Sequence, residues 1–97
     1  MKIYISGGMS GYPDLNFPAF DRAKAKLIAE GHTVVSPADL DRTRGQMPYE
    51  AMLRDDLRYL LECDAIYMLR SWETSNGAKL EKYVAEKLLF KVLYEGR

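Results

Sequence analysis

The sequence predicts an α/β fold in which a parallel four-stranded sheet lies between layers of helices. Short apolar runs alternate along the chain with longer segments whose apolar residues recur every three or four positions. The first pattern is typical of buried strands and the second of amphipathic helices. Strands that alternate with helices form parallel sheets with right-handed crossovers. We therefore expect a small Rossmann-like or flavodoxin-like three-layer sandwich with strand order 2-1-3-4, in a single domain over residues 1–97.

Four short runs are predicted to be the strands. They cover residues 2–6, 33–35, 64–69 and 92–94, and each is rich in apolar or β-branched side chains. The first run stops at a pair of glycines and the second at Ser36-Pro37, which are residues that favour turns. These stops set the lengths expected for the first two strands.

Three segments between the strands are predicted to be helices. The first follows Asn16, a residue that can cap a helix, and has Pro18 in its first turn. The second begins at Pro48, and the third follows Ser75, which can serve as its N-cap. Residues 38–47 are mostly polar, and we predict a loop there.

Composition argues against several classes of function. Fourteen basic and fourteen acidic residues cancel, so the chain has no basic stripe and we expect no nucleic-acid partner. No apolar run approaches membrane-spanning length, and the N-terminal run is too short for a signal peptide, so we expect no membrane partner. One Cys and one His form no ligand cluster, so we expect neither a metal nor a cofactor. The lone Cys63 fits a reducing, cytoplasmic location.

The segment from Ser75 to Glu81 is the strongest candidate for a functional site. It joins the third strand to the last helix, and Gly77 lets the backbone approach a ligand closely. Glu81 falls in the first turns of that helix, beside the carboxyl end of the strand, where ligands of open α/β sheets bind. A carboxylate there can act as a nucleophile or base on a small molecule. An ordinary capped helix with a favourable early glutamate is the alternative.

A glycine-rich loop follows the first strand and is a second candidate. It reads Ser6-Gly7-Gly8-Met9-Ser10-Gly11, and exposed amides in such a loop can hold a phosphate or a sugar. Its spacing matches neither the dinucleotide fingerprint nor a Walker loop, and a simple tight turn is the alternative. Tyr4 on the strand before it either points to the same crevice or belongs to the core, and the strand alone favours the core.

Carboxylates occur at two further places of interest. Asp64 lies where a helix gives way to an apolar strand, and burial there would raise its pKa and suit a general acid. A turn capped by the aspartate itself is the alternative. Asp55 precedes Arg58 by three residues, so for Asp55 and its neighbour Asp56 a surface salt bridge is the preferred interpretation.

Taken together, these residues resemble the nucleoside 2-deoxyribosyltransferase superfamily, and above all its small DUF4406 branch. The resemblance covers nearly the whole chain and depends on the order and spacing of short motifs. The motifs are Tyr4-Ile5-Ser6-Gly7, Phe17-Pro18-Ala19-Phe20, Gly31-His32-Thr33-Val34-Val35-Ser36-Pro37-Ala38, Asp56-Leu57, Leu60-Leu61-Glu62-Cys63-Asp64-Ala65-Ile66-Tyr67, Ser75-Asn76-Gly77-Ala78 and Glu81.

The resemblance implies a role for four of these side chains. Glu81 would attack the anomeric carbon of a 2-deoxynucleoside or its monophosphate, and Asp64 would assist the leaving base. Tyr4 would orient the sugar, and Ser75 would contact the sugar or its 5′ group. Glycosidic carbons react through an oxocarbenium-like state, so one carboxylate attacks while an acid assists departure. Acceptance of the sugar by a second base gives transfer, and acceptance by water gives hydrolysis.

Two other classes of function stay open. The chain could be a non-catalytic nucleotide-binding or sensor module that uses the same crevice, or an interaction protein that binds nothing small. We also expect a homo-oligomer, because the core is small and one side of the second helix is apolar. The alternative is that this side, made of Tyr49, Met52, Leu53 and Leu57, only covers the sheet.

Overall fold

A computed structural model describes residues 1–96 and confirms the predicted parallel sheet. Its strands are β1 (Lys2–Ser6), β2 (Thr33–Val35), β3 (Ala65–Met68) and β4 (Lys91–Tyr94). Neighbouring strands pair in parallel in the order β2-β1-β3-β4. In the sheet, β2 lies on one side of β1, whereas β3 and then β4 lie on its other side. The direction in which successive strands are added therefore reverses between β1 and β3. Ligands of open α/β sheets bind at such a switch point.

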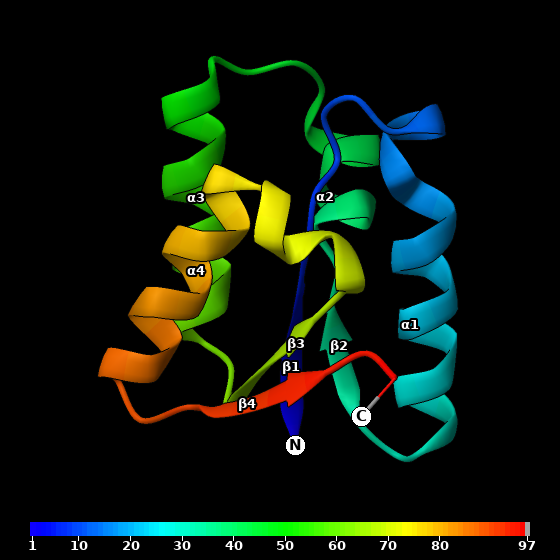
Figure 1. Cartoon of the computed structure of the whole chain (residues 1–97), viewed down its shortest axis with the longest axis vertical. Coiled ribbons are helices and arrows are strands. Elements are labelled where there is room, and N and C mark those ends of the chain that lie inside the picture. The colour runs from blue at the N-terminus through cyan, green and yellow to red at the C-terminus, as the bar shows by residue number, and fades with distance from the viewer. Residues whose placement is uncertain (97) are drawn as a thin grey trace.

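Helices cover both faces of this sheet and give the three expected layers (Figure 1). On one side lie α1 (Phe17–Ala29) and α2 (Pro37–Arg44), and on the other lie α3 (Tyr49–Leu61) and α4 (Asn76–Lys87). Two 3₁₀ segments, Pro13–Asn16 and Arg70–Thr74, follow the glycine-rich loop and β3. None of the helices in residues 1–96 has the length and apolar character needed to cross a membrane.

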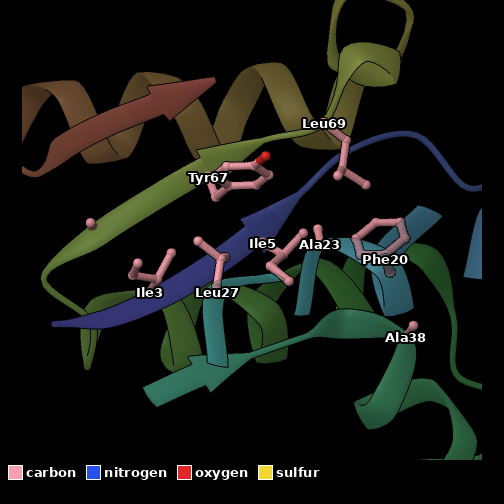
Figure 2. Packing of buried hydrophobic residues seen from close by; sticks show 9 residues of the cluster. Ile3, Ile5, Phe20, Ala23, Leu27, Ala38, Tyr67 and Leu69 are labelled. Carbon is pink, nitrogen blue, oxygen red and sulfur yellow. The ribbon is translucent and has the colours of Figure 1, made fainter. Parts of the chain in front are cut away.

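Side chains of each strand alternate between two hydrophobic cores, as the pleat of a strand requires. The core on the α1 side contains Ile3, Ile5, Phe20, Ala23, Leu27, Ala38, Ala65, Tyr67 and Leu69, most of which appear in Figure 2. The core under α3 and α4 contains Tyr4, Leu60, Cys63, Ile66, Met68, Ala78 and Ala85. Ser6 follows Tyr4 by two residues, so both hydroxyls leave β1 on the face that α4 covers.

The predicted loop over residues 38–47 is wrong for most of its length, because α2 continues to Arg44. This helix has a proline in its first turn, Asp39 also in the first turn, and Arg42 and Arg44 in the last. Those residues suit the ends of a helix, where charges interact favourably with its dipole. Gly45 ends α2 with a φ of 73°, a conformation that favours glycine.

Asn16 precedes α1 as predicted, but its side chain does not cap the helix. Its amide nitrogen donates instead to the carbonyl of Gly8 at 2.9 Å and to Oγ of Ser71 at 3.2 Å. Asp14, Leu15 and Asn16 all have positive φ, which lets this short segment turn back over the loop. The glycine-rich loop is therefore held against the segment that follows β3.

Candidate active site

A pocket of about 480 Å³ opens at the carboxyl edge of β1, within the size range of small-molecule sites. The glycine-rich loop forms one side, and the first turns of α3 and α4 form the other. Its lining residues are Gly7, Gly8, Met9, Ser10, Tyr12, Phe20, Pro37, Met47, Tyr49, Met52, Leu53, Asp56, Thr74, Ser75, Asn76, Gly77, Ala78 and Glu81. The structure thus brings most of the predicted site residues together in one place.

Glu81 is one of the residues that line this pocket, and it is only 5% exposed. The hydroxyl of Tyr4 donates to Oε2 at 2.7 Å, and the hydroxyl of Ser6 donates to Oε1 at 2.6 Å. Both hydroxyls come from alternate positions of β1, while the carboxyl comes from α4. Each carboxyl oxygen is therefore fixed by its own donor, and Tyr4, although buried in the core, also contributes to the site.

Burial gives Glu81 an unusual affinity for protons. The pKa of this carboxyl is raised from 4.5 to about 7, mainly because the side chain is removed from water and in smaller part because Asp56 nearby is negatively charged. The hydrogen bonds from Ser6 and Tyr4, and the charge of Arg44, act in the opposite direction. Burial likewise raises the pKa of Tyr4, so this hydroxyl keeps its proton and remains a donor. A carboxyl that titrates near neutral pH in a pocket is typical of a functional group.

The raised pKa of Glu81 predicts a pH-dependent stability. The carboxyl is protonated in both folded and unfolded chains below pH 4.5, and its contribution to stability is lost as the pH rises through about 7. We expect Glu81→Gln, which cannot ionise, to be more stable than the wild type at pH 8, by up to about 3 kcal/mol. Urea unfolding of both proteins at pH 5 and pH 8 measures this, and an equal difference at both pH values would contradict it.

The glycine-rich loop lines the pocket but is less free to hold a ligand than the sequence suggested. A Cβ atom on Gly7 would lie 2.8 Å from Cβ of Leu69, so the loop can approach β3 only with glycine there. The amide of Gly8 donates to Oγ of Ser71 at 2.9 Å. The amide of Gly8, which the sequence predicted as one of the groups that could hold a ligand, therefore already donates a hydrogen bond within the chain.

The start of α4 is organised as predicted. The side chain of Ser75 accepts a hydrogen bond from the amide of Ala78 at 3.1 Å, which confirms Ser75 as the N-cap. A Cβ atom on Gly77 would meet Oη of Tyr49 at 3.5 Å and Cδ1 of Leu53 at 3.7 Å, which are ordinary contacts. Gly77 is therefore not required by the backbone, and its missing side chain leaves space in the pocket.

The structure does not place Asp64 in this pocket, so its predicted position in the crevice is wrong. Asp64 is exposed at the amino end of β3, where its Oδ2 accepts a hydrogen bond from the amide of Lys2 at 3.0 Å. The pocket lies at the other end of the strands, roughly 13 Å away along β3 at the usual rise of a strand. A residue that precedes a strand of a parallel sheet lies at the edge opposite to the residues that follow it.

A different carboxyl, that of Asp56 on α3, lines the pocket instead. Its side chain is 13% exposed, and Oδ1 lies 2.7 Å from Nη2 of Arg44. Burial raises the pKa of Asp56 to about 6 even though the charge of Arg44 lowers it. Asp56 was not predicted as a site residue, although helical spacing places it on one face of α3 with Leu53 and Leu60. A carboxylate on the apolar face of a helix was the signal that could have revealed it.

The apolar side of α3 is largely used within the chain. Met52 and Leu53 line the pocket, Leu57 packs against the core beneath α3 and α4, and only Tyr49 is strongly exposed. This side therefore gives no support for a partner helix, and self-association stays a prediction.

Within residues 1–96, no group of three or more Cys, His, Asp and Glu side chains is arranged to hold a metal ion.

The chain belongs to the family described as a domain of unknown function, DUF4406, whose pattern it matches over residues 1–94. Among solved structures it is similar to a 2-desoxiribosyltransferase from Leishmania mexicana, with a TM-score of 0.73 and 21% sequence identity. The match covers 96% of this chain but 62% of the other, so the two share the Rossmann-like fold over part of the longer chain. No curated protein sequence matches this chain.

Proposed function

We propose that this protein cleaves the N-glycosidic bond of a 2-deoxynucleoside or deoxynucleoside monophosphate, with Glu81 as the nucleophile. The observation that carries the proposal is the buried carboxyl of Glu81 in the lining of a pocket, with one hydroxyl donating to each oxygen. A carboxylate that is fixed in this way presents its oxygens in one orientation, so little orientational freedom has to be lost before it attacks. The fold shared with a 2-desoxiribosyltransferase supports the same chemistry.

The proposed reaction has two steps. In the first, an oxygen of ionised Glu81 bonds to the anomeric carbon while the bond to the base breaks, and its electrons leave with the base. In the second, water or another base attacks the same carbon and releases the carboxylate. The hydroxyls of Tyr4 and Ser6 keep the carboxylate oriented through both steps. Whether the product is a free sugar or a new nucleoside depends on the acceptor that enters.

Asp56 takes the role that the family resemblance assigned to Asp64. Its carboxyl lines the pocket, and its pKa of about 6 lies close to that of Glu81 at about 7. The two groups influence each other and titrate as a pair, which holds about one proton between these values. The reaction starts from the form of this one-proton state in which Glu81 is the attacking carboxylate and Asp56 holds the proton for the leaving base, which is the less populated form by the order of the two pKa values.

The remaining walls of the pocket suit a flat base joined to a sugar. Met47, Met52 and Leu53 supply apolar surface, and Tyr49 adds an aromatic ring near the start of α4. Ser75 and Asn76 supply polar groups to the pocket wall at the start of the helix that carries Glu81. We assign the base to the apolar side and the sugar to the polar side, with its anomeric carbon toward Glu81.

The proposal is tested by incubating the protein with a panel of deoxynucleosides and their 5′-monophosphates and separating free base by chromatography. We expect base release from at least one deoxy compound and poor release from the matching ribonucleosides. Adding a second base distinguishes transfer from hydrolysis. Tight binding of nucleotides with no release of base from any compound would refute the enzyme and favour a nucleotide-binding module.

Filling the space at Gly77 should separate stability from substrate binding. Gly77→Ala adds a methyl group to the pocket wall without backbone strain, and alanine favours a helix by up to about 1 kcal/mol over glycine. We therefore expect a variant that is at least as stable as the wild type, with a KM for the deoxynucleoside raised about tenfold by crowding. Lys79→Ala, an exposed change in the same helix, is the control, and an unchanged KM for Gly77→Ala would contradict this location of the substrate.

A further inference from the structure

The short turn before α1 has a backbone conformation that is rare for the residues it contains. Asp14, Leu15 and Asn16 have φ values of 53°, 53° and 61°, in the left-handed region that residues other than glycine disfavour. Asparagine tolerates this region better than most residues, but three such residues in a row store strain. Strain of this kind persists only where the surrounding structure holds it, and it is common at functional sites.

The side chain of Asn16 connects this turn to the glycine-rich loop. Its Nδ2 group donates to the carbonyl of Gly8 at 2.9 Å and to Oγ of Ser71 at 3.2 Å. The same Oγ accepts a hydrogen bond from the amide of Gly8 at 2.9 Å. Both hydrogens of the Asn16 amide group and both backbone polar groups of Gly8 are thus used. We call these three residues, Gly8, Asn16 and Ser71, the loop clamp.

The backbone of the loop lies close to its neighbours at Gly8. A Cβ atom at this position would lie 3.0 Å from Cε2 of Tyr12 and 3.2 Å from the carbonyl oxygen of Ser71. Both distances are shorter than ordinary van der Waals contacts, so a larger residue would push these neighbours away. Glycine at position 8 therefore suits the short hydrogen bonds of the loop clamp.

The loop clamp acts from behind the wall of the pocket. Gly8 lines the pocket that contains Glu81, whereas Asn16 and Ser71 line a second cavity of about 420 Å³. Tyr12 lines both cavities, so the loop lies between them. Because there is open space behind the loop, packing alone does not hold it against the first pocket. The hydrogen bonds of the loop clamp supply this restraint.

We propose that Asn16 is a positioning residue for the substrate, because through Gly8 and Ser71 it holds the glycine-rich loop in place as a preformed wall of the pocket. The proposal rests on the function proposed above, since the loop would lie against the bound deoxynucleoside. Without the clamp the loop is free to move toward the second cavity, and each binding event has to order it again. Ordering a loop on binding reduces affinity, and a preformed wall avoids that loss.

The loop clamp should act on substrate binding and not on the chemical step. Glu81 is held by the hydroxyls of Tyr4 and Ser6, and the hydrogen bonds of the clamp involve neither of these side chains. Loss of the clamp should therefore raise KM and leave kcat nearly unchanged, which is the kinetic pattern of lost substrate binding. A role in folding alone would lower the melting temperature and leave KM unchanged.

The test compares Asn16→Gly and Ser71→Ala with the wild type. Glycine adopts the left-handed conformation of position 16 without strain, so Asn16→Gly removes the side chain and keeps the turn. Ser71→Ala removes the acceptor that Asn16 and Gly8 share. We expect each variant to raise KM for the deoxynucleoside about tenfold, with kcat within about twofold of the wild type. The double variant should raise KM by less than the product of the single effects, because both changes remove the same contact.

Leu15→Gly is the matched control in the same turn. Leu15 is 51% exposed, and glycine relieves left-handed strain at this position without removing a hydrogen bond of the loop clamp. We expect its KM to stay within about twofold of the wild type. A KM that rises equally in Leu15→Gly and Asn16→Gly, or in neither, would overturn the proposal. Should Asn16→Gly fail to fold, Ser71→Ala decides it against the same control.

Two measurements without turnover separate this proposal from the proposed function. In Asn16→Gly the acceptor Ser71 is still present, so faster hydrogen exchange of the Gly8 amide reports opening of the loop, and we expect it to be at least about tenfold faster. An unchanged exchange rate would overturn the proposal. The affinity for 2′-deoxyadenosine or 2′-deoxycytidine, measured by titration calorimetry, should fall about tenfold.

The two proposals then fail in different ways. A wild-type protein that releases no base, but binds these nucleosides with an affinity that depends on Asn16 as described, would refute the glycosidic reaction and leave the role of Asn16 in place. Base release with a KM that is the same in the wild type, Asn16→Gly and Ser71→Ala would refute the role of Asn16 alone.

Discussion

Replacing Glu81 with glutamine should reduce the release of free base from a deoxynucleoside by at least about a thousandfold, the scale expected on loss of a covalent catalyst. Glutamine is nearly isosteric, and its amide can still hydrogen-bond to the hydroxyls of Tyr4 and Ser6. It lacks the anionic oxygen that attacks the anomeric carbon. The measurement is the initial rate of base release by chromatography, with circular dichroism to verify the fold.

A matched change on the same helix controls for effects on α4 itself. Glu86 is exposed and pairs with Lys82 at 2.9 Å, so Glu86→Gln loses one weak surface ion pair. We expect this variant to release base at the wild-type rate. If Glu81→Gln and Glu86→Gln were equally active, the nucleophile would not be Glu81.

Replacing Asp56 with asparagine should have the second-largest effect. General acid catalysis contributes about 10²–10⁴-fold, so base release should fall by that factor for substrates whose base needs a proton to leave. For a substrate with a base that departs easily as an anion, the loss should be about tenfold or less. Comparing the two substrates in the wild type and in Asp56→Asn measures the acid role separately from binding.

Asp64→Asn is the control for this experiment, because it changes the carboxyl that the family resemblance had favoured. Asp64 is exposed at the far edge of the sheet, where its carboxylate accepts a hydrogen bond from the amide of Lys2. We expect it to leave the rate of base release within about twofold of the wild type. A large loss for Asp64→Asn with no loss for Asp56→Asn would reverse our assignment of the acid.

Most of the fold could be predicted because buried apolar residues recur along the sequence with the period of the helix or strand that they belong to. The four strands and α1, α3 and α4 all carry apolar residues at the spacing of their structure, and the crossover rule then gives the strand order. The exception is α2, whose few apolar residues show no helical period. It forms because its end residues suit a helix and because Ala38 packs into the core.

The failure to predict α2 also explains why Asp56 was missed as a site residue. Glu81 and Ser6 could be predicted because residues near the carboxyl ends of parallel strands meet at one edge of the sheet, whereas the strand alone favoured the core for Tyr4 and only the family resemblance implied a place in the site. The surroundings of Asp56 depend on Arg44 reaching it from the end of α2. Without α2 as a helix, its nearest visible partners were those along its own helix, and a surface salt bridge was the simplest interpretation.

The central claim is that Glu81 forms a bond to the sugar, and a trapped intermediate tests it most directly. A deoxynucleoside that carries fluorine at C2 of the sugar slows both steps, since fluorine destabilises the oxocarbenium-like state. After incubation with this compound, mass spectrometry of the intact protein should show the mass of one sugar added, and peptide mapping should place it on Glu81. Glu81→Gln should gain no mass. A sugar attached to any other residue, or to the Glu81→Gln variant, would contradict the claim.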